Sequence, residues 1–338
     1  MLILGLETSC DDTACAIVED NKILANIISS QTDLHKKYGG IIPELASRKH
    51  LETINILIEE AFKKAKVGFN DINLIAVTYG PGLKGSLLIG LSCAKAISYA
   101  KGIPLVGVSH LEGHLYANFL EHKNISMPLT ALIISGGHSD LILMKKHGDY
   151  EVLGRTRDDA VGEAYDKVAK LLELGYPGGP IIDKLAKEGN PKAVHFTRPY
   201  LKGSWDFSFS GIKTAVVNHV AKAPHLTRQA KADIVASFQQ AVIEVLVHKT
   251  IEAAKKFRVK TIILGGGVAS NSALRTLFEQ RAKDEKLKLY YPVPVLCTDN
   301  AAMIAGAAYY KVKNKKAKKL LTPADFRKLQ AEPDLGIV

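Results

Sequence analysis

Cysteine, long apolar segments and a basic leader are all scarce or missing in this sequence. Its 338 residues include only four cysteines, which form no metal-binding or redox motif, so we expect reduced residues of the interior. No apolar run reaches the roughly 18 residues that a membrane span requires. The first five residues also lack the basic side chains that open a signal peptide. We therefore expect a cytoplasmic protein with no membrane partner.

Length and charge suggest a two-lobed protein that binds a polyanion. A chain of 338 residues exceeds one ordinary core, and 47% hydrophobic residues with 27 glycines are typical of a soluble α/β enzyme. The formal net charge is +11, from 45 Lys and Arg against 34 Asp and Glu. The run from Lys311 to Lys319 contains six lysines. Such a run could contact nucleic acid or could be ordinary solvated surface.

Two histidines one helical turn apart give the strongest chemical signal. The apolar run Pro104–Val108 predicts a buried strand, and Ser109 with Glu112 has the capping-box pattern that starts a helix. His110 and His114 would then project side by side and could bind one metal ion, although two ordinary buried histidines fit equally well. A zinc-protease signature would place a glutamate directly after the first histidine. Here Glu112 comes one position later, and the helix cap explains it.

Two hairpins with polar turns indicate an internal repeat. Residues 2–7 and 13–19 predict two strands joined by the turn Thr8–Asp12, whose hydroxyls and carboxylates could bind phosphate or a cation or could be structural. Residues 130–135 and 140–144 predict a second hairpin. Its turn contains Gly136 and Gly137, where backbone N–H groups could approach a phosphate. The repetition favours two related lobes.

Two further segments place polar residues at expected helix starts. A strand at 259–264 leads through Gly265–Asn271 into a helix, an arrangement that suits an anion or nucleotide although it matches no standard phosphate-loop pattern. Asp299 precedes an alanine- and glycine-rich helix and is either its N-cap or a ligand. Residues 198–213 predict an ordered loop or a short strand without deciding between them.

Taken together, these motifs resemble the TsaD family (formerly Gcp or YgjD) over nearly the whole chain. The sequences of Pro43–Ser47 and Trp205–Ser210 are similar to those of the bacterial branch of this family. The segments that carry the resemblance are Met1–Val18, Gly39–Arg48, His110 with His114, Ser135–His138, Tyr176–Pro180, Ser208–Lys213 and Gly265–Asn271.

The resemblance implies both a fold and an activity. The fold is the α/β architecture of actin, Hsp70 and sugar kinases (ASKHA), with two duplicated lobes around a nucleotide cleft. We expect an N-terminal lobe of residues 1–108 plus about 299–325, and a C-terminal lobe of residues 109–298. The implied activity is that of an acyltransferase, an N6-threonylcarbamoyladenine synthase. It would move the threonylcarbamoyl group from threonylcarbamoyl-AMP to N6 of the adenosine beside the anticodon in tRNAs that read ANN codons, forming t6A and releasing AMP.

Matching the family's motifs also implies particular residues. One divalent metal per subunit, iron(II) or zinc, would be bound by His110, His114 and Asp299, since two histidines and a carboxylate with open positions suit both. Asp11, in the first hairpin turn, is a candidate for positioning the attacking amine or a cation, and a structural role explains it almost as well. The residues implied to bind the adenylate substrate are Ile133, Ile134, Ser135, Gly136, Gly137, Asp166, Gly179, Asp183 and Asn271.

Partners and rival functions complete the expectations. Besides tRNA, the resemblance implies a TsaB-like paralogue and a TsaE-like ATPase as partners, with a TsaC-like enzyme supplying the substrate. An ASKHA-type ATPase or kinase would use the glycine turns but leave the histidine pair without a role. A metalloprotease conflicts with the position of Glu112. A nucleotide-binding scaffold remains open beside catalysis.

Overall fold

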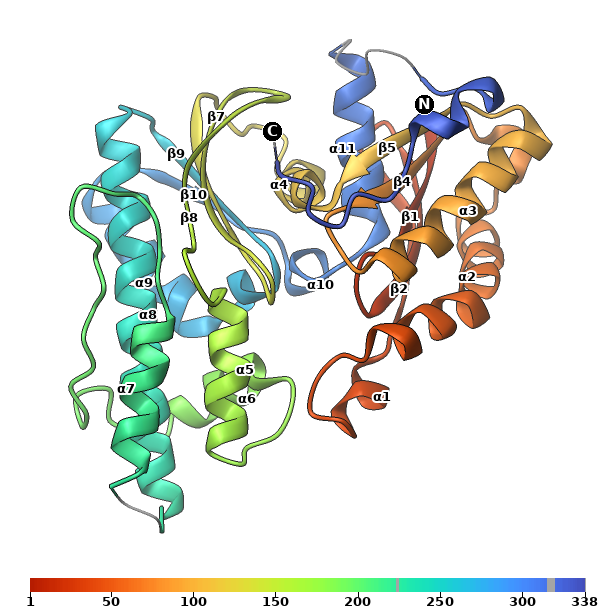
Figure 1. Ribbon diagram of the computed structural model, residues 1–338. Coiled ribbons are helices and arrows are strands. Elements are labelled where there is room, and N and C mark those ends of the chain that lie inside the picture. Colours follow the sequence, from red (N-terminus) through yellow and green to blue (C-terminus); the bar gives the residue numbers. More distant parts are fainter. Residues whose placement is uncertain (223–224, 315–319, 338) are drawn as a thin grey trace. The chain divides into compact units, whose positions relative to one another are not determined.

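The computed structural model describes residues 1–222, 225–314 and 320–337, and the chain divides into two compact units (Figure 1). The first unit comprises Met1–Ile125, His147–Asp149 and Pro292–Val338; the second comprises Ser126–Lys146 and Tyr150–Tyr291. These bounds differ from the expected lobes. The helix α4 (His110–Glu121), expected in the C-terminal lobe, belongs to the first unit, where it packs against α11 (Ala301–Lys313). None of the described helices is long and apolar enough to cross a membrane.

The first unit is built on a mixed five-stranded sheet in the order β3-β2-β1-β4-β5. The central strand β1 pairs antiparallel with β2 and parallel with β4. The strands are β1 (Leu2–Glu7), β2 (Asp12–Glu19), β3 (Lys22–Ser30), β4 (Leu74–Gly80) and β5 (Leu105–Ser109). Besides α4 and α11, the helices are α1 (Thr32–Lys36), α2 (Pro43–Ala65), α3 (Lys84–Lys101) and α10 (Pro294–Cys297), with 3-10 turns η1 (Phe69–Asp71) and η3 (Pro323–Lys328).

Alternation along β1 assigns its side chains to two different faces of the sheet. Leu2, Leu4 and Leu6 enter an apolar core that they share with α2 and α3. Gly5 lies on the opposite face, where a Cβ would overlap the carbonyl oxygen of Ala301 in α11. Glu7 is two residues further along the strand, so it lies on the same face as Gly5, beside α11 and α4.

The second unit repeats this topology. Its sheet has the order β10-β9-β6-β7-β8, in which β6 pairs antiparallel with β7 and parallel with β9. The correspondence is strand for strand, so the internal repeat predicted from the two hairpins is confirmed. The strands are β6 (Leu129–Ile134), β7 (Ser139–Lys146), β8 (Asp149–Arg155), β9 (Thr261–Gly265) and β10 (Lys288–Tyr290).

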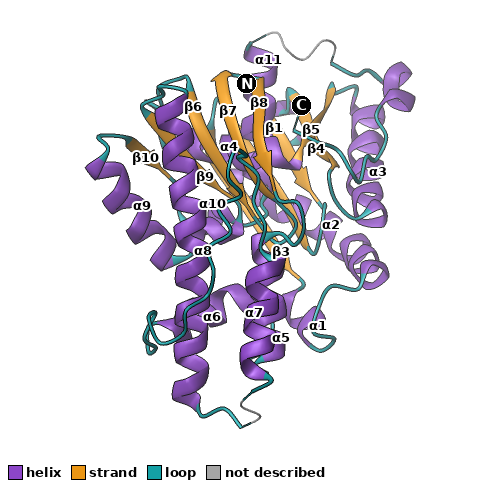
Figure 2. Cartoon of the chain, turned by 60° about the vertical axis from the view of Figure 1, so that its left-hand side comes forward, coloured by secondary structure: helices purple, strands orange, loops and turns teal. Residues whose placement is uncertain are grey.

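Helices of the second unit pack on this sheet and on one another, and Figure 2 shows its strands beside α8 and α9. The long helix α8 buries Ile234, Phe238 and Val242 as its sequence pattern predicts. Helix α6 begins at Gly178. The helices are α5 (Val161–Leu171), α6 (Gly178–Ala186), α7 (Ser210–Val220), α8 (Arg228–Lys256) and α9 (Ser272–Asp284), with the 3-10 turn η2 (Gly267–Ser270).

Candidate functional site

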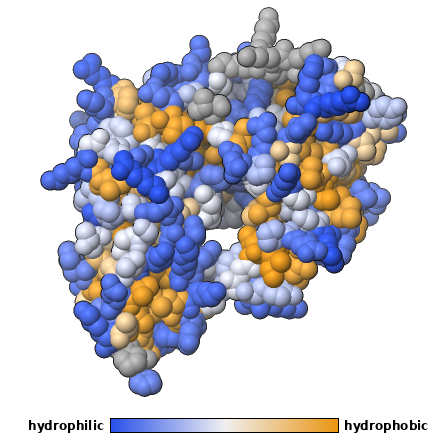
Figure 3. Space-filling model, viewed as in Figure 1, coloured by the Kyte–Doolittle hydropathy of each residue, from blue (hydrophilic) through white to orange (hydrophobic). Residues whose placement is uncertain are grey.

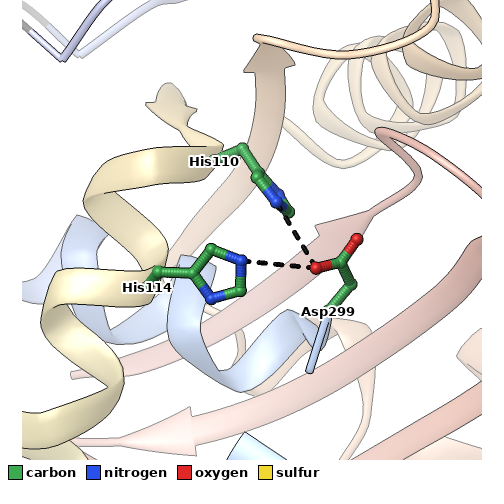
Figure 4. A group of neighbouring side chains, drawn as sticks. All are labelled: His110, His114 and Asp299. Carbon is green, nitrogen blue, oxygen red and sulfur yellow. Dashed lines mark ion pairs between the residues drawn. The ribbon is translucent and has the colours of Figure 1, made fainter. Parts of the chain in front are cut away.

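Three side chains of the first unit converge on one point (Figure 4). Asp299 Oδ1 lies 3.4 Å from His110 Nε2 and 3.3 Å from His114 Nε2. One ligand atom from each residue lies within 4.8 Å of the other two. His110 and His114 are buried, and the Asp299 side chain is 22% exposed. The i, i+4 spacing places both imidazoles on one face of α4, and Asp299 lies just before α11, which packs against α4. Together they form a compact group of two imidazoles and one carboxylate.

The arrangement fits a metal ion on two grounds. Two ligand atoms bound tetrahedrally at about 2.1 Å lie roughly 3.4 Å apart, which matches both contacts with Asp299. Both ring nitrogens of His114 are buried and, among the described residues, have no hydrogen-bond partner, because the contact with Asp299 lacks hydrogen-bond alignment. An unpaired buried imidazole is costly. A cation bound by His114 Nε2 and Asp299 would remove part of that cost.

Glu7 orients the first histidine from behind. The Glu7 carboxylate is fully buried, and its Oε2 lies 3.0 Å from His110 Nδ1. Thr78 Oγ1 donates to the same oxygen at 2.7 Å, and Ser9 N–H donates to Oε1 at 2.5 Å. A carboxylate accepts hydrogen bonds, so the Nδ1–H of His110 donates to Glu7, and Nε2 is the nitrogen that faces Asp299 and can bind a metal once it carries no proton. Metal-binding histidines have this carboxylate partner in many proteins.

The pKa values of the two histidines shift in opposite directions. Burial alone would lower the pKa of His110, but the neighbouring carboxylates of Asp299 and Glu7 outweigh it and hold that pKa well above its ordinary value. Burial lowers the pKa of His114, so this imidazole is neutral. Burial opposes ionisation of Asp299 too, yet the charge of His110 keeps the Asp299 pKa low. A proton on His110 thus occupies the place that a metal cation would take.

Glu112 has no part in the group. Its Oε2 accepts the N–H of Ser109 at 3.4 Å and forms an ion pair with Lys311 Nζ at 2.6 Å. The helix begins at His110, with Ser109 as its N-cap residue, as predicted. A carboxylate used in this way is not placed as the base of a zinc protease.

Asp299 does not cap the helix that follows it. The N-cap of α11 is Asn300, whose side-chain oxygen accepts the N–H of Met303 at 3.0 Å. That leaves the Asp299 carboxylate to the histidines. Of the two roles that the sequence left open for Asp299, the structure therefore supports the ligand.

The turn Thr8–Asp12 lies within the electrostatic reach of this group. Burial and the charge of Asp299 raise the pKa of Asp11, the residue singled out from the sequence. The same two causes raise the pKa of Asp12 to about 7. His50, fully buried on α2, lies 3.0 Å through Nε2 from the carbonyl oxygen of Cys10 and so supports the turn. A cation or a substrate amine near Asp299 would therefore also be near Asp11.

In the second unit, the predicted substrate residues gather at three turns. Gly162 N–H donates to Ser135 O at 3.2 Å, which places the start of α5 on the β6–β7 turn. Gly266, with φ of +88°, lies against Ile134 O, so the loop after β9 crosses the end of β6. Ile133 and Ile134 are fully buried, so of the predicted residues at this turn a ligand could reach only Ser135, Gly136 and Gly137. A Cβ on Gly136, Gly137, Gly179 or Gly267 would meet no atom within 4 Å, so each turn presents open backbone.

The polar residues among the predicted set also hold these turns together. Asp166 Oδ1 accepts the N–H of Gly178 at 2.7 Å at the start of α6. Asp183 accepts both the N–H and the hydroxyl of Ser272, each at 3.1 Å, at the start of α9. Asn271 caps α9 through Leu274 N–H and donates to Gln239 Oε1 at 2.8 Å. Substitution of Asn271 would therefore disturb the fold as well as any ligand contact.

Two features depart from, or lie beyond, what the sequence suggested. Glu7 was part of a recognised motif but had no assigned role; a charged residue ending an otherwise apolar strand was the available signal.

In the lysine run, Lys311 pairs with Glu112, and Lys313 Nζ lies 5.3 Å from the ring centroid of Tyr309. Residues 315–319, with the other four lysines, lie outside the described residues, so a tRNA contact by that run stays a prediction.

Solved structures support the fold. The chain is similar to full-length HypF in its phosphate- and nucleotide-bound form, with a TM-score of 0.62 and 15% identity, covering 94% of this chain and 56% of that one. For T. kodakarensis HypF the TM-score is 0.63, also at 15% identity, with 93% and 48% covered. At this identity the likeness concerns architecture alone. With the duplicated sheets it confirms the predicted ASKHA fold.

Sequence comparisons show the family. A family model described as TsaD, tRNA N6-adenosine threonylcarbamoyltransferase, matches residues 22–306. A tRNA N6-adenosine threonylcarbamoyltransferase of Clostridioides difficile (strain 630) is 53% identical over 319 residues, 94% of each chain. One of Symbiobacterium thermophilum is 54% identical over 310 residues, 91% of each. The chain therefore belongs to the TsaD family of tRNA N6-adenosine threonylcarbamoyltransferases.

Proposed function

We propose that this protein transfers the threonylcarbamoyl group from threonylcarbamoyl-AMP to N6 of the adenosine beside the anticodon of tRNA. The observation that carries the proposal is the group of His110, His114 and Asp299, supported by Glu7, in a chain whose relatives are named for this activity. An ATPase or kinase of the same fold would have no use for two buried imidazoles facing one carboxylate.

The reaction is an acyl transfer. The N6 amine attacks the carbamoyl carbon, a C–N bond forms, the bond from that carbon to the phosphate oxygen breaks, and AMP leaves while N6 loses a proton. Asp11 is the candidate for orienting the amine, because the raised pKa of its carboxyl lets it exchange a proton closer to neutral pH than an ordinary aspartate. Asp11→Asn with wild-type turnover would assign this residue a structural role instead.

His110, His114 and Asp299 would hold the metal. Two nitrogens and one oxygen suit iron(II) or zinc, one ion per subunit, and leave coordination positions for substrate oxygens. A bound metal supplies Lewis-acid polarisation and a template for the acyl phosphate, so no protein nucleophile is needed. The chain's own contribution is to keep both Nε2 atoms facing Asp299, through the Glu7 contact on His110 and the fixed spacing on α4.

The adenylate would bind in the second unit. Its phosphate suits the Ser135–Gly137 turn, where the N–H groups of Gly136 and Gly137 have no partner among the described residues and open space lies above both. The start of α9, reached through Gly265–Asn271, would receive the base. Asp166 and Asp183 hold the starts of α6 and α9 by accepting the N–H groups of Gly178 and Ser272, and Gly179 is the second residue of α6.

Wider assignments follow from the family. The tRNA is the acceptor substrate, a TsaC-like enzyme would supply the adenylate, and a TsaB-like paralogue and a TsaE-like ATPase would act with this chain. Because its acceptor is tRNA, the protein would work in the cytoplasm.

Incubation with threonylcarbamoyl-AMP, unmodified tRNA and these partners tests the proposal. We expect mass spectrometry of the digested tRNA to show the threonylcarbamoyl nucleoside, with one AMP released for each group transferred. ATP hydrolysis without nucleoside formation would favour the kinase or ATPase. Adenylate binding without any chemistry would favour a scaffold.

A further inference from the structure

The starts of β9 and β10 carry a group of cations that the proposed chemistry does not use. Arg258 and Lys260 lie in the connection from α8 to β9, Lys286 lies in the connection from α9 to β10, and Lys288 is the first residue of β10. The two connections lie side by side, because Lys288 N–H donates to Lys260 O at 2.8 Å. All four side chains are exposed. We name Arg258, Lys260, Lys286 and Lys288 the basic edge.

Ordinary structural roles do not account for this charge. Cations in the last turn of a helix stabilise its carbonyl end, which explains Lys255 and Lys256 in α8 and their counterparts in α9. The basic edge lies beyond both helix ends. A lysine on an edge strand also discourages pairing with another chain, which explains Lys288 alone. Within the described residues, no member of the basic edge forms an ion pair, whereas neighbouring Lys255 pairs with Glu252 and Glu285.

The surroundings favour a nucleic acid over a protein as the partner. The core of a protein interface is apolar, yet no large exposed hydrophobic residue is found among the described residues between 252 and 290. Large hydrophobic residues do reach the surface in other parts of the chain, and on the face shown in Figure 3 hydrophobic and hydrophilic residues are interspersed. Lysine and arginine side chains without an apolar centre suit contacts to phosphates, which depend on charge and not on sequence.

Its place in the sheet separates the basic edge from the predicted adenylate turns. Strands β6 and β9 are parallel, so their glycine turns lie together at one end of the sheet and the basic edge lies at the other. The five residues of β9 span about 17 Å at 3.3 Å each. A phosphate on the basic edge therefore belongs to a different part of the RNA from a nucleotide that reacts at those turns.

We propose that the basic edge binds the phosphate backbone of the tRNA body, outside the anticodon arm. That the RNA is tRNA rests on the proposed function. The location of the contact rests on the position of the basic edge at the end of the sheet opposite the glycine turns. The site adds affinity and orientation without reading bases. Full-length tRNA should thus bind more tightly than an isolated anticodon stem-loop, with a steeper dependence on salt.

The test compares two variants that each remove four positive charges. One replaces Arg258, Lys260, Lys286 and Lys288 with Gln. The control replaces Lys22, Lys63, Lys64 and Lys66, exposed residues of the first unit, in the same way. Fluorescence anisotropy measures binding of unmodified full-length tRNA and of its anticodon stem-loop across a salt series, and thermal melting checks that both variants are folded.

We expect the basic-edge variant to bind full-length tRNA at least tenfold more weakly than wild type at low salt. The slope of log K against log salt should fall by about 3, at 0.7 to 0.9 for each phosphate that the protein no longer neutralises. Stem-loop binding and the control variant should be unchanged. Unaltered tRNA binding, or an equal loss for tRNA and stem-loop, would overturn the proposal. Transfer activity of the wild type on the stem-loop is measured separately, so a failure of the proposed function is distinguishable.

Discussion

Replacing Glu7 by glutamine should weaken metal binding more than its conservative chemistry suggests. Three donors point at this carboxylate: Ser9 N–H, the Thr78 hydroxyl and His110 Nδ1–H. A carboxylate accepts all three. A glutamine side chain offers one accepting oxygen and an NH2 group, so at least one donor would face another donor at full burial. The His110 ring would then lose either its orientation or the proton position that frees Nε2.

The size of the effect follows from this contact. Loss of the partner behind a metal-binding histidine costs 10- to 100-fold in metal affinity in general, which corresponds to about 1.4 to 2.7 kcal/mol. We expect Glu7→Gln toward the upper end, since the contact is buried and charge-assisted. Glu112→Gln is the matched control, because Glu112 is a buried carboxylate on α4 that contacts Ser109 and Lys311 and neither histidine.

Competition between the protein and a chelator for zinc or cobalt(II) gives the affinity, and melting of the metal-free proteins shows whether each variant is folded. The cobalt spectrum adds a readout of ligand geometry that a general loss of stability would not change. A Glu7→Gln affinity within twofold of wild type would refute the reasoning. So would an equal loss in Glu112→Gln, because the effect would then come from α4 as a whole.

The remaining predictions concern protons and the glycine turn. In the metal-free protein His110 holds a proton near neutral pH, so metal binding should release it and strengthen as pH rises; calorimetry in two buffers of different ionisation enthalpy should show this release, and equal heats would contradict it. Burial raises the pKa of Asp12 to about 7, so between about pH 5 and 7 the folded state binds more protons than the unfolded state. The free energy of unfolding of the wild type should therefore fall by about 2–3 kcal/mol from this group as pH rises from about 5 to 7. Denaturant unfolding of Asp12→Asn should show a free energy that depends less on pH over the same range. Gly137→Ala should leave the melting temperature unchanged, because its Cβ meets open space, yet weaken AMP binding severalfold in calorimetry. Gly211→Ala, equally unobstructed but in α7, should leave AMP binding unchanged.

The sequence predicted most of the regular structure, because its strongest signals are local. Alternating or continuous apolar runs gave β1, β2, β6, β7 and β9, and the capping-box pattern of Ser109 and Glu112 gave the start of α4. The strands β3, β8 and β10 were not anticipated. β10 has only three residues and carries no clear apolar pattern, whereas β3 contains Ile23, Leu24, Ala25, Ile27 and Ile28 and was missed despite that signal. Their places depend on pairing with strands that the sequence did reveal.

The three candidate metal-binding residues were predictable from the sequence, but the contact between Glu7 and His110 was not. The spacing of His110 and His114 suits a metal pair and two ordinary buried histidines equally well. Asp299 required the family resemblance, since an aspartate before a helix is ordinarily its cap. Asn300 takes that role instead. The contact between Glu7 and His110 joins residues 103 positions apart. No local pattern reports such a contact; it follows from alternation along β1 combined with the packing of α4.

Formation of the threonylcarbamoyl nucleoside by the Asp299→Ala variant tests the account most directly. Wild type and variant, both shown to be folded by melting, receive the same threonylcarbamoyl-AMP, unmodified tRNA and partner proteins, and the digested tRNA is analysed by mass spectrometry alongside the metal content of each protein. The account predicts that the wild type binds one metal and forms the nucleoside, and that Asp299→Ala loses both the metal and product above background. A metal-free Asp299→Ala that forms the nucleoside at the wild-type rate would contradict it.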